Sequence, residues 1–170
     1  MYRKITPQIC AEALWAVQTD LLLQCGVSTI LLDMDNTLAY WKSAEVPQEN
    51  LRWLECARRE GFKFYIVSNG KKERVDALAR KLKIGCVKNA GKPSKKRMQA
   101  IIKQLGVRPE ETALVGDQLF TDILAANRCG MVAVLVQPLD RKREWWATKA
   151  FNRSRERLVW KKVFKDGQNP

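Results

Sequence analysis

Two aspartates stand two residues apart: Asp33 ends the apolar run "STILLD", and Asp35 lies in the turn that follows. Asp is unfavourable in a strand, and neighbouring carboxylates repel each other, so this pair needs a compensating positive charge. A divalent cation supplies it, and Mg²⁺ prefers carboxylate oxygens and bound water. A carboxylate on a strand end can also act as a nucleophile while its neighbour moves protons. The pair therefore has the residue types that one part of a metal-assisted phosphoryl-transfer site needs.

Three further segments place polar side chains at the edges of expected elements. Ser68 and Asn69 end "FKFYIVSN", Lys92 precedes a helix that opens at Pro93, and Asp117 ends "TALVGD". Ligands of parallel sheets bind outside the carboxyl ends of the strands, so these groups should converge on one edge. A serine hydroxyl can hydrogen-bond phosphoryl oxygens, and a lysine places positive charge on the transferring group. The four segments together predict one phosphoryl-transfer site.

Simpler structural explanations exist for several of these residues. Ser68 and Asn69 are common turn formers, and Asp122 could cap the helix that follows it. Lys92 could be a solvated lysine, because Lys95 and other basic residues follow it closely. The residue types alone leave these alternatives open.

The elements that must hold these residues alternate along the chain. Apolar runs predict strands at 28–33, 62–69, 85–89, 112–117 and 131–138, and helical spacing with Pro and Gly boundaries predicts helices at 8–24, 47–61, 71–83, 93–106 and 122–129. Such alternation is typical of βαβ units. We therefore expect an α/β fold with three layers, a mostly parallel sheet between helices, over a core at 28–138.

Composition limits the possible chemistry. With 170 residues and 46% hydrophobic content, the chain is long enough for one domain over 1–170 with a substantial core. It has no histidine, which excludes Ser-His-Asp catalysis and His-ligated metals. Its five cysteines are scattered and odd in number, which favours reduced thiols over a disulfide framework or a zinc site. Catalysis must use carboxylates, Lys, Ser or Thr, and a hard metal.

Charge and the N-terminal stretch indicate partners and location. The net charge of +13 favours an anionic partner, which could be a nucleic acid, an anionic membrane or a phosphorylated substrate. The stretch "MYRKITPQ" has no apolar core of signal-peptide length, and no apolar run approaches the length of a spanning helix. We therefore expect a cytoplasmic protein.

Four motifs, in order, resemble motifs I to IV of the haloacid dehalogenase (HAD) superfamily. They are residues 33–38 (DMDNTL), 68–69 (SN), 92–93 (KP) and 116–122 (GDQLFTD). The D-x-D-N-T opening, the G-D-Q-L-x-T-D segment and the tail "KAFNRSRERLVWKK" resemble more closely the YqeG family of HAD subclass IIIA phosphatases. That family is related to mitochondrial phosphatidylglycerophosphate phosphatases. The resemblance implies a Rossmann-like HAD core and a Mg²⁺-dependent phosphatase that forms an aspartyl-phosphate.

The resemblance also implies a role for each matched position. Asp33 would be the nucleophile and a Mg²⁺ ligand. Asp35 would be the general acid and then the base, and its backbone carbonyl would face the metal. Asp117 would bind Mg²⁺ directly or through water, and Asp122 would support it from the next turn.

Three more matched positions would serve the transferred phosphoryl group. The resemblance implies that Ser68 and Lys92 hold this group, with Asn69 beside them. No position of the four motifs is missing, so the site has no sign of decay.

The segments between the motifs bear on the substrate. HAD caps are inserted between motifs I and II or between motifs II and III, and here residues 37–68 and 69–92 hold little more than a loop and one helix each. Without a cap domain, the open edge suits a phosphate presented on something large, such as a lipid headgroup, a nucleic-acid end or a protein.

The basic tail offers a choice among these substrates. Residues 140–166 hold ten Lys and Arg against four Asp and Glu, and Val159, Trp160, Val163 and Phe164 fall on one face of a possible helix. This face could pack on the domain or lie at an anionic membrane. We expect phosphatidylglycerophosphate as substrate, with peripheral contact at the inner face of the membrane. A phosphatase for polynucleotide ends or other phosphomonoesters, and a nucleic-acid or ribosome-associated binding protein, remain alternatives; the sequence indicates no oligomeric state.

Overall fold

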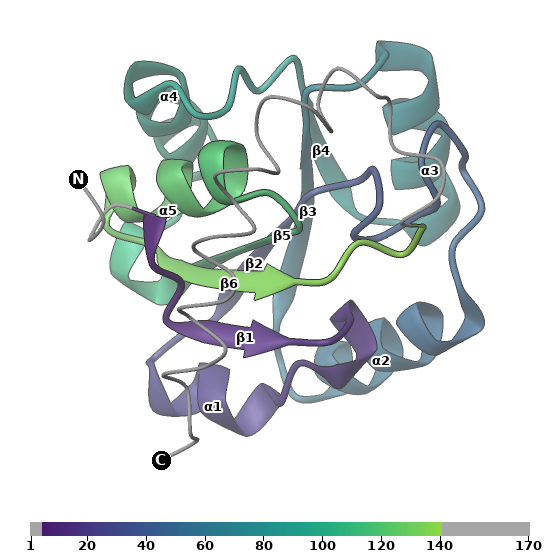
Figure 1. Ribbon diagram of the computed structural model, residues 1–170, viewed down its shortest axis with the longest axis horizontal. Helices are drawn as coiled ribbons and strands as arrows, with labels where there is room; N and C mark the ends of the chain where they lie inside the picture. Colours follow the sequence, from purple (N-terminus) through teal and green to yellow (C-terminus); the bar gives the residue numbers. More distant parts are fainter. Residues whose placement is uncertain (1–4, 141–170) are drawn as a thin grey trace. The chain divides into compact units, whose positions relative to one another are not determined.

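A parallel sheet of six strands forms the centre of the computed structural model, which describes residues 5–140 (Figure 1). Its strand order is β1-β6-β5-β2-β3-β4. The strands are β1 (Ile9–Ala11), β2 (Thr29–Leu32), β3 (Lys63–Ser68), β4 (Gly85–Lys88), β5 (Thr112–Gly116) and β6 (Val132–Val136). All five neighbouring pairs are parallel. The predicted parallel sheet is therefore confirmed.

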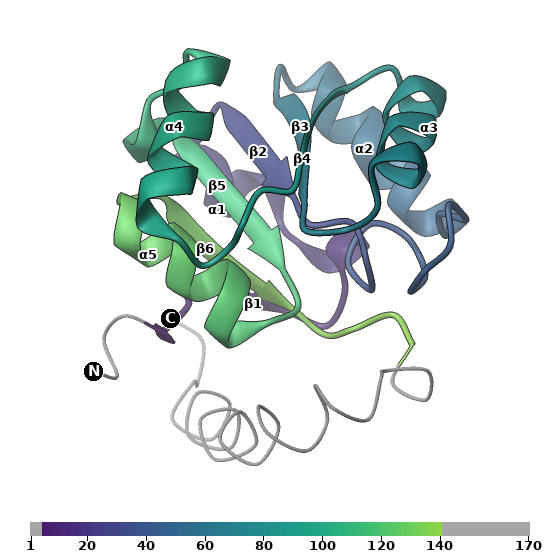
Figure 2. The ribbon, with the colours of Figure 1, turned by 90° about the horizontal axis from the view of Figure 1, so that it is seen from above.

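Helices cover both faces of this sheet. Helices α2 (Gln48–Arg59) and α3 (Lys72–Leu82) lie on one face, and α4 (Lys95–Leu105) and α5 (Leu124–Cys129) lie on the other (Figure 2). Because both faces are covered, β2 and β5 are buried along their whole length and read as continuous apolar runs rather than alternating patterns. The expected three-layer α/β/α architecture is confirmed.

The predicted helix at 8–24 is wrong over its first part. Residues Ile9–Ala11 form β1, which pairs with β6 so that Ile9 lies opposite Val134. A short 3₁₀ turn, η2 (Leu14–Ala16), follows, and helix α1 begins only at Thr19 and ends at Gln24. The apolar spacing of so short a stretch fits a strand as well as a helix. Here the stretch forms a strand, because the backbone N–H and C=O groups along the open edge of β6 need hydrogen-bond partners.

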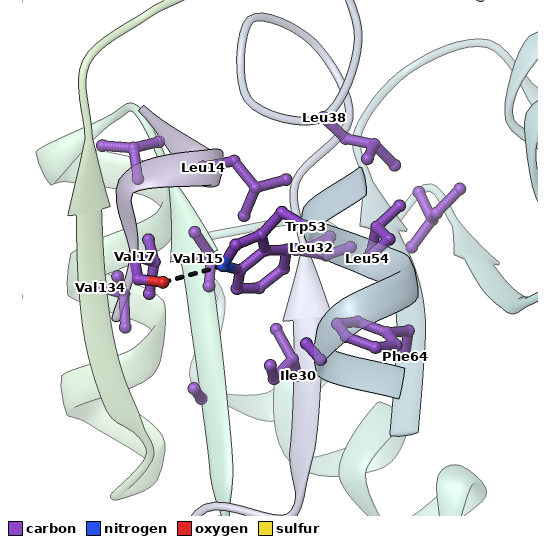
Figure 3. Close-up of a cluster of buried hydrophobic side chains, with 14 of the residues drawn as sticks. Leu14, Val17, Ile30, Leu32, Leu38, Trp53, Leu54, Phe64, Val115 and Val134 are labelled. Atoms are coloured by element: carbon purple, nitrogen blue, oxygen red, sulfur yellow. Dashed lines mark hydrogen bonds between the residues drawn. The ribbon is translucent and has the colours of Figure 1, made fainter. Parts of the chain in front are cut away.

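The N-terminal segment is fixed to the core by a tryptophan on α2. The indole Nε1–H of Trp53 donates a hydrogen bond of 2.8 Å to the carbonyl of Val17 (Figure 3). Its ring lies edge-on to Phe64, with ring centroids 5.9 Å apart, and it is 8% exposed. Leu14 and Leu22 belong to the same buried cluster, so one face of the sheet is closed by the segment between β1 and β2.

The Trp53→Phe variant tests this attachment. It removes the indole N–H, leaves the carbonyl of Val17 without its partner and deletes part of a packed ring, so we expect the free energy of unfolding to fall by about 1–3 kcal/mol. Urea unfolding followed by circular dichroism measures it. Trp15→Phe, at a position 40% exposed, should change stability by less than about 0.5 kcal/mol. Equal effects of the two substitutions would contradict the assigned contact.

No cap domain is inserted within residues 5–140. Residues 33–47 join β2 to α2, and residues 69–71 join β3 to α3, so both connections are loops. Among these residues, no helix is long and apolar enough to cross a bilayer. The predicted apolar face of the tail (Val159, Trp160, Val163 and Phe164) lies outside the described residues.

Candidate active site

The strand register brings the predicted site residues to one edge. Leu32 of β2 lies opposite both Ile66 of β3 and Val115 of β5. The backbone N–H of Asp33 donates to the carbonyl of Val115 (2.9 Å), so the ladder continues into the residue that follows the strand. Ser68 ends β3, and Asp117 directly follows β5. These groups therefore extend from three adjacent strands at their carboxyl ends, as the sequence predicted.

The turn after β2 owes its shape to Asn36. This residue has φ of 64°, in the left-handed region that Asn tolerates better than most residues. Its N–H donates to the carbonyl of Ala39 (2.8 Å), while the N–H groups of Leu38 and Ala39 donate to the carbonyl of Met34. The chain therefore reverses directly behind Asp35, which keeps both aspartates at the edge of the sheet.

Three carboxylates gather at this edge. Asp33, Asp117 and Asp122 each contribute one oxygen to a group whose members lie within 4.8 Å of one another. All three residues are buried, and Asp122 is only 1% exposed. Buried like charges at this separation need a counter-charge, and hard carboxylate oxygens are the ligands that Mg²⁺ takes. The donor set therefore fits a divalent hard cation.

A π-helical turn, η4 (Leu119–Ile123), places Asp122 in this group. The Asp122 Oδ2 accepts a hydrogen bond from the N–H of Gln118 (3.2 Å), so the carboxylate folds back over the start of its own turn. The predicted helix at 122–129 thus begins earlier, with a wider turn before α5. Gly116 has no side chain at the point of closest approach, where a Cβ would collide with the Asp122 carboxylate.

The Gly116→Ala variant tests the need for this space. The new methyl group must displace Asp122 from the carboxylate group, so we expect phosphatase activity to fall at least about tenfold and stability to fall by about 1–3 kcal/mol. Gly85→Ala is a matched control, because its Cβ would crowd the ring of Tyr65 at the start of the edge strand β4, which carries no site residue. The control should lose stability while its folded molecules keep their kcat/KM. A Gly116→Ala variant with wild-type activity would refute the argument.

Lys92 lies between two of the carboxylates. Its Nζ is 2.6 Å from Asp33 Oδ1 and 2.7 Å from Asp122 Oδ1, and its side chain is 1% exposed. The alternative of a solvated surface lysine therefore does not hold. Asn69 orients Lys92 from the neighbouring loop, since its side-chain amide donates to the Lys92 carbonyl and accepts from the Lys92 N–H, both at 3.2 Å. Both ends of the Asn69 amide are engaged in this way.

Burial and the contact between Asp33 and Lys92 shift the pKa of each residue in opposite directions. Burial raises the pKa of Asp33 from its ordinary 3.8 to about 7, helped by the charge of Asp122 and opposed by that of Lys92. Burial disfavours the charged form of Lys92, but Asp122 and Asp33 outweigh it and raise the lysine pKa above its ordinary value. Lys92 therefore stays protonated, but its single positive charge offsets only part of the negative charge of the three carboxylates, so a further cation would stabilise the group.

Asp35 lies among donors instead. Both carboxylate oxygens accept hydrogen bonds from the guanidinium of Arg74, with Asp35 Oδ2 2.7 Å from Nη2. The backbone N–H of Lys42 donates to Oδ1 (2.8 Å). The hydrogen bond to Asp35, which outweighs partial burial, raises the pKa of Arg74. Ser68 lies nearby and its Oγ accepts from the N–H of Gly70 (2.9 Å).

Sequence reasoning did not identify Arg74. The residue stands in the first turn of a helix that carries several other basic residues, so nothing in its residue type distinguishes it. An excess of cations at the start of this helix was visible, since Lys71, Lys72 and Arg74 all oppose the positive end of the helix dipole. That signal marks the three residues alike and does not single out Arg74.

Comparison with known sequences finds relatives of this chain. The sequence model of haloacid dehalogenase-like hydrolases matches residues 43–130. A Bacillus subtilis protein described as "Probable phosphatase YqeG" is 30% identical over 153 residues, which cover 90% of this chain and 88% of that protein. The Arabidopsis thaliana protein "Phosphatidylglycerophosphate phosphatase 1, chloroplastic/mitochondrial" is 25% identical over 98% of this chain, which spans 50% of that longer protein.

A solved structure has a similar fold. The crystal structure of 3-deoxy-D-manno-octulosonate 8-phosphate phosphatase from Moraxella catarrhalis, described as a complex with magnesium and phosphate ions, superposes with a TM-score of 0.53. The match covers 69% of this chain and 73% of that one at 18% identity, so it supports the fold alone. With the family match over residues 43–130 and the 30% identical relative, the chain belongs to the haloacid dehalogenase-like hydrolases and is a phosphatase of that family.

Proposed function

We propose that this phosphatase is Mg²⁺-dependent, acts through an aspartyl-phosphate on Asp33, and hydrolyses phosphatidylglycerophosphate at an anionic membrane surface. The observation that carries the chemistry is the group of Asp33, Asp117 and Asp122 at the carboxyl edge of the sheet, where Asp33 and Asp122 also contact Lys92. The choice of lipid is supported by the 25% identity to a phosphatidylglycerophosphate phosphatase over 98% of the chain.

The reaction has two steps. A carboxylate oxygen of Asp33 attacks phosphorus, the bond from phosphorus to the ester oxygen breaks, and Asp35 gives a proton to the departing alcohol. Water then attacks the aspartyl-phosphate and loses a proton to Asp35, which releases inorganic phosphate and restores the Asp33 carboxylate. In this proposal the Ser68 hydroxyl and the Lys92 ammonium bind the phosphoryl oxygens, and Asn69 keeps Lys92 in place.

The metal would be held by Asp33, Asp117 and Asp122, with the backbone carbonyl of Asp35 as a further ligand. Mg²⁺ bound there would offset negative charge on the phosphoryl oxygens. Its removal with a chelator should abolish phosphate release, and a titration with Mg²⁺ should restore it.

A cationic rim around the site supports an anionic substrate surface. The exposed residues at the start of α3 and α4 include Lys71, Lys72, Lys95, Lys96 and Arg97. Helix α3 begins shortly after the carboxyl end of β3 and α4 shortly after that of β4, so these residues stand at the same edge of the sheet as the site (Figure 2). They oppose the helix dipoles, and near an anionic bilayer each basic residue gains about 1 kcal/mol. The rim is therefore suited to peripheral binding at the inner face of the membrane.

A substrate panel tests the proposal. Purified protein with Mg²⁺ is given phosphatidylglycerophosphate in anionic vesicles, a 3′-phosphorylated oligonucleotide and a set of sugar phosphates, and released phosphate is measured. We expect the highest kcat/KM for the lipid. Preference for the oligonucleotide would replace the lipid with polynucleotide ends, for which the same rim would serve.

The Asp33→Asn variant is the control for every substrate. Loss of release in this variant assigns the activity to the site. Release that is equal in the variant and the wild type would reject the site, and RNA binding that survives without any turnover would favour a binding protein instead.

A further inference from the structure

We infer that Arg74 binds a second anionic group of the substrate and thereby selects phosphomonoesters whose leaving group carries one. The inference rests on the proposed function in one respect, because it takes Asp35 as the residue that faces the leaving oxygen. It adds a recognition residue that is no part of the four motifs and a chemical class for the leaving group.

The contacts of Arg74 hold its guanidinium in place but use only some of its N–H donors. Nη1 donates to Asp35 and to the carbonyl of Ser43 (3.3 Å), and Nη2 donates to Asp35 Oδ2 (2.7 Å). Three of the five N–H groups have these partners, and within residues 5–140 neither Nε–H nor the second Nη2–H donates a hydrogen bond. The side chain is 19% exposed, so part of it is open to a ligand.

Gly70 shows how close Arg74 lies to the phosphoryl-binding side. A Cβ placed on Gly70 would lie 3.0 Å from Arg74 Nη2, 3.1 Å from Ser68 Oγ and 3.2 Å from Asp35 Oδ2. The guanidinium, the serine hydroxyl and the proposed acid therefore surround one small space, which glycine leaves unfilled. A substrate with its phosphoryl group at Ser68 and its ester oxygen at Asp35 brings the next few bonds of its leaving group to Arg74.

The charges differ between the two sides of the site. Asp33, Asp117 and Asp122 make the metal side anionic, whereas Arg74 and the N–H of Lys42 make the Asp35 side rich in donors. An arginine fork binds phosphate or carboxylate through paired hydrogen bonds, and one held in place beforehand loses less entropy on binding. A leaving alcohol without an anionic group would form none of these paired hydrogen bonds with Arg74. A leaving alcohol with a phosphodiester or carboxylate nearby fits it, and phosphatidylglycerophosphate has a phosphodiester on the same glycerol.

Binding measurements isolate this contact. The Asp33→Asn background prevents turnover, so calorimetry with Mg²⁺ can compare two soluble ligands that share a glycerol leaving group. Glycerophosphoglycerol phosphate, the deacylated lipid, has the phosphodiester, and glycerol 3-phosphate lacks it. We expect the first to bind about 10- to 100-fold more tightly, and Arg74→Met in the same background to remove most of that difference.

Turnover measurements separate recognition from a positioning role. In the otherwise wild-type chain, Arg74→Met should lower the ratio of kcat/KM for the two ligands, headgroup over glycerol 3-phosphate, by about tenfold or more. Arg74→Lys should restore part of the ratio, since it keeps the charge but not the fork. Arg80→Met, an exposed position on the same helix, should leave the ratio unchanged. Circular dichroism of each variant reports whether it is folded.

The outcomes are distinguishable. An equal loss for both ligands would mean that Arg74 only positions Asp35, and an unchanged ratio or equal binding of the two ligands would also overturn the inference. Neither result would affect the proposed function, which instead fails if the Asp33→Asn variant hydrolyses the lipid as fast as the wild type.

Discussion

The Asp33→Asn variant is expected to release phosphate at least about 10³-fold more slowly than the wild type while it keeps its fold. An amide cannot attack phosphorus as the carboxylate does, and no other carboxylate can replace it, because Asp117 and Asp122 extend from a different strand end and turn. Phosphate release under saturating Mg²⁺ measures the effect. Asp35→Asn should lose activity by a different route, since it keeps the nucleophile and removes the proton donor.

The same substitution should stabilise the protein when no divalent metal is present. The pKa of Asp33 is about 7 in the folded protein against an ordinary 3.8, so the folded state binds this proton more tightly than the unfolded state does. The free energy of unfolding of the wild type should therefore fall as the pH rises from about 4 to about 7, whereas the variant lacks this loss. We expect the variant to be more stable by about 1–3 kcal/mol at pH 8 in EDTA, and the advantage to shrink toward pH 4.

Urea unfolding at both pH values checks the sign. A variant less stable than the wild type at pH 8 would mean that the attraction of Lys92 for Asp33 outweighs the burial of the carboxylate. In that case repulsion among the three buried carboxylates would not destabilise the metal-free protein, and electrostatics would no longer support a metal site there.

Much of the site could be predicted because each part depends on a short pattern. An apolar run that ends in Asp33, Ser68 or Asp117 places that residue at the carboxyl end of a strand, and parallel pairing brings the carboxyl ends of neighbouring strands to the same edge of the sheet. The start of α4 is similarly local: the sequence predicted it at Pro93, and the helix begins at Lys95 after the N-cap Ser94, whose side chain accepts from the N–H of Arg97. Fold class and strand ends therefore follow from the sequence with little tertiary information.

What could not be predicted depends on partners far apart in the sequence. Residues 9–11 become a strand only because β6, more than a hundred residues later, offers an edge. The pairing of Arg74 with Asp35 joins helix α3 to the turn after β2, and the π-helical turn at Asp122 is set by its contact with Lys92 and by the space at Gly116. Asn69 was expected beside the phosphoryl group, and its engagement with the backbone of Lys92 required the loop geometry.

Lys92→Met should have the largest effect on stability of any single substitution in the site. The methionine keeps most of the volume but removes the positive charge that lies 2.6 Å from Asp33 and 2.7 Å from Asp122. Removal of one partner from a buried ion pair leaves uncompensated charge and lowers the free energy of unfolding by about 3–5 kcal/mol. Urea unfolding at pH 8 in EDTA measures this loss, with Lys95→Met at the exposed start of α4 as the matched control.

The activity and metal response of the Lys92 variant complete the argument. Loss of a positive charge on the transferring phosphoryl group should lower kcat by at least about 10²-fold. Without the lysine ammonium and without metal, the carboxylates lack the positive charge that contacts Asp33 and Asp122. Saturating Mg²⁺ should therefore raise the free energy of unfolding of Lys92→Met by more than it raises that of the wild type. If Mg²⁺ stabilises both proteins equally, the lysine and the metal do not act on the same carboxylates. The unequal response is expected, because Lys92 and a cation at Asp33, Asp117 and Asp122 would share two of the three ligands.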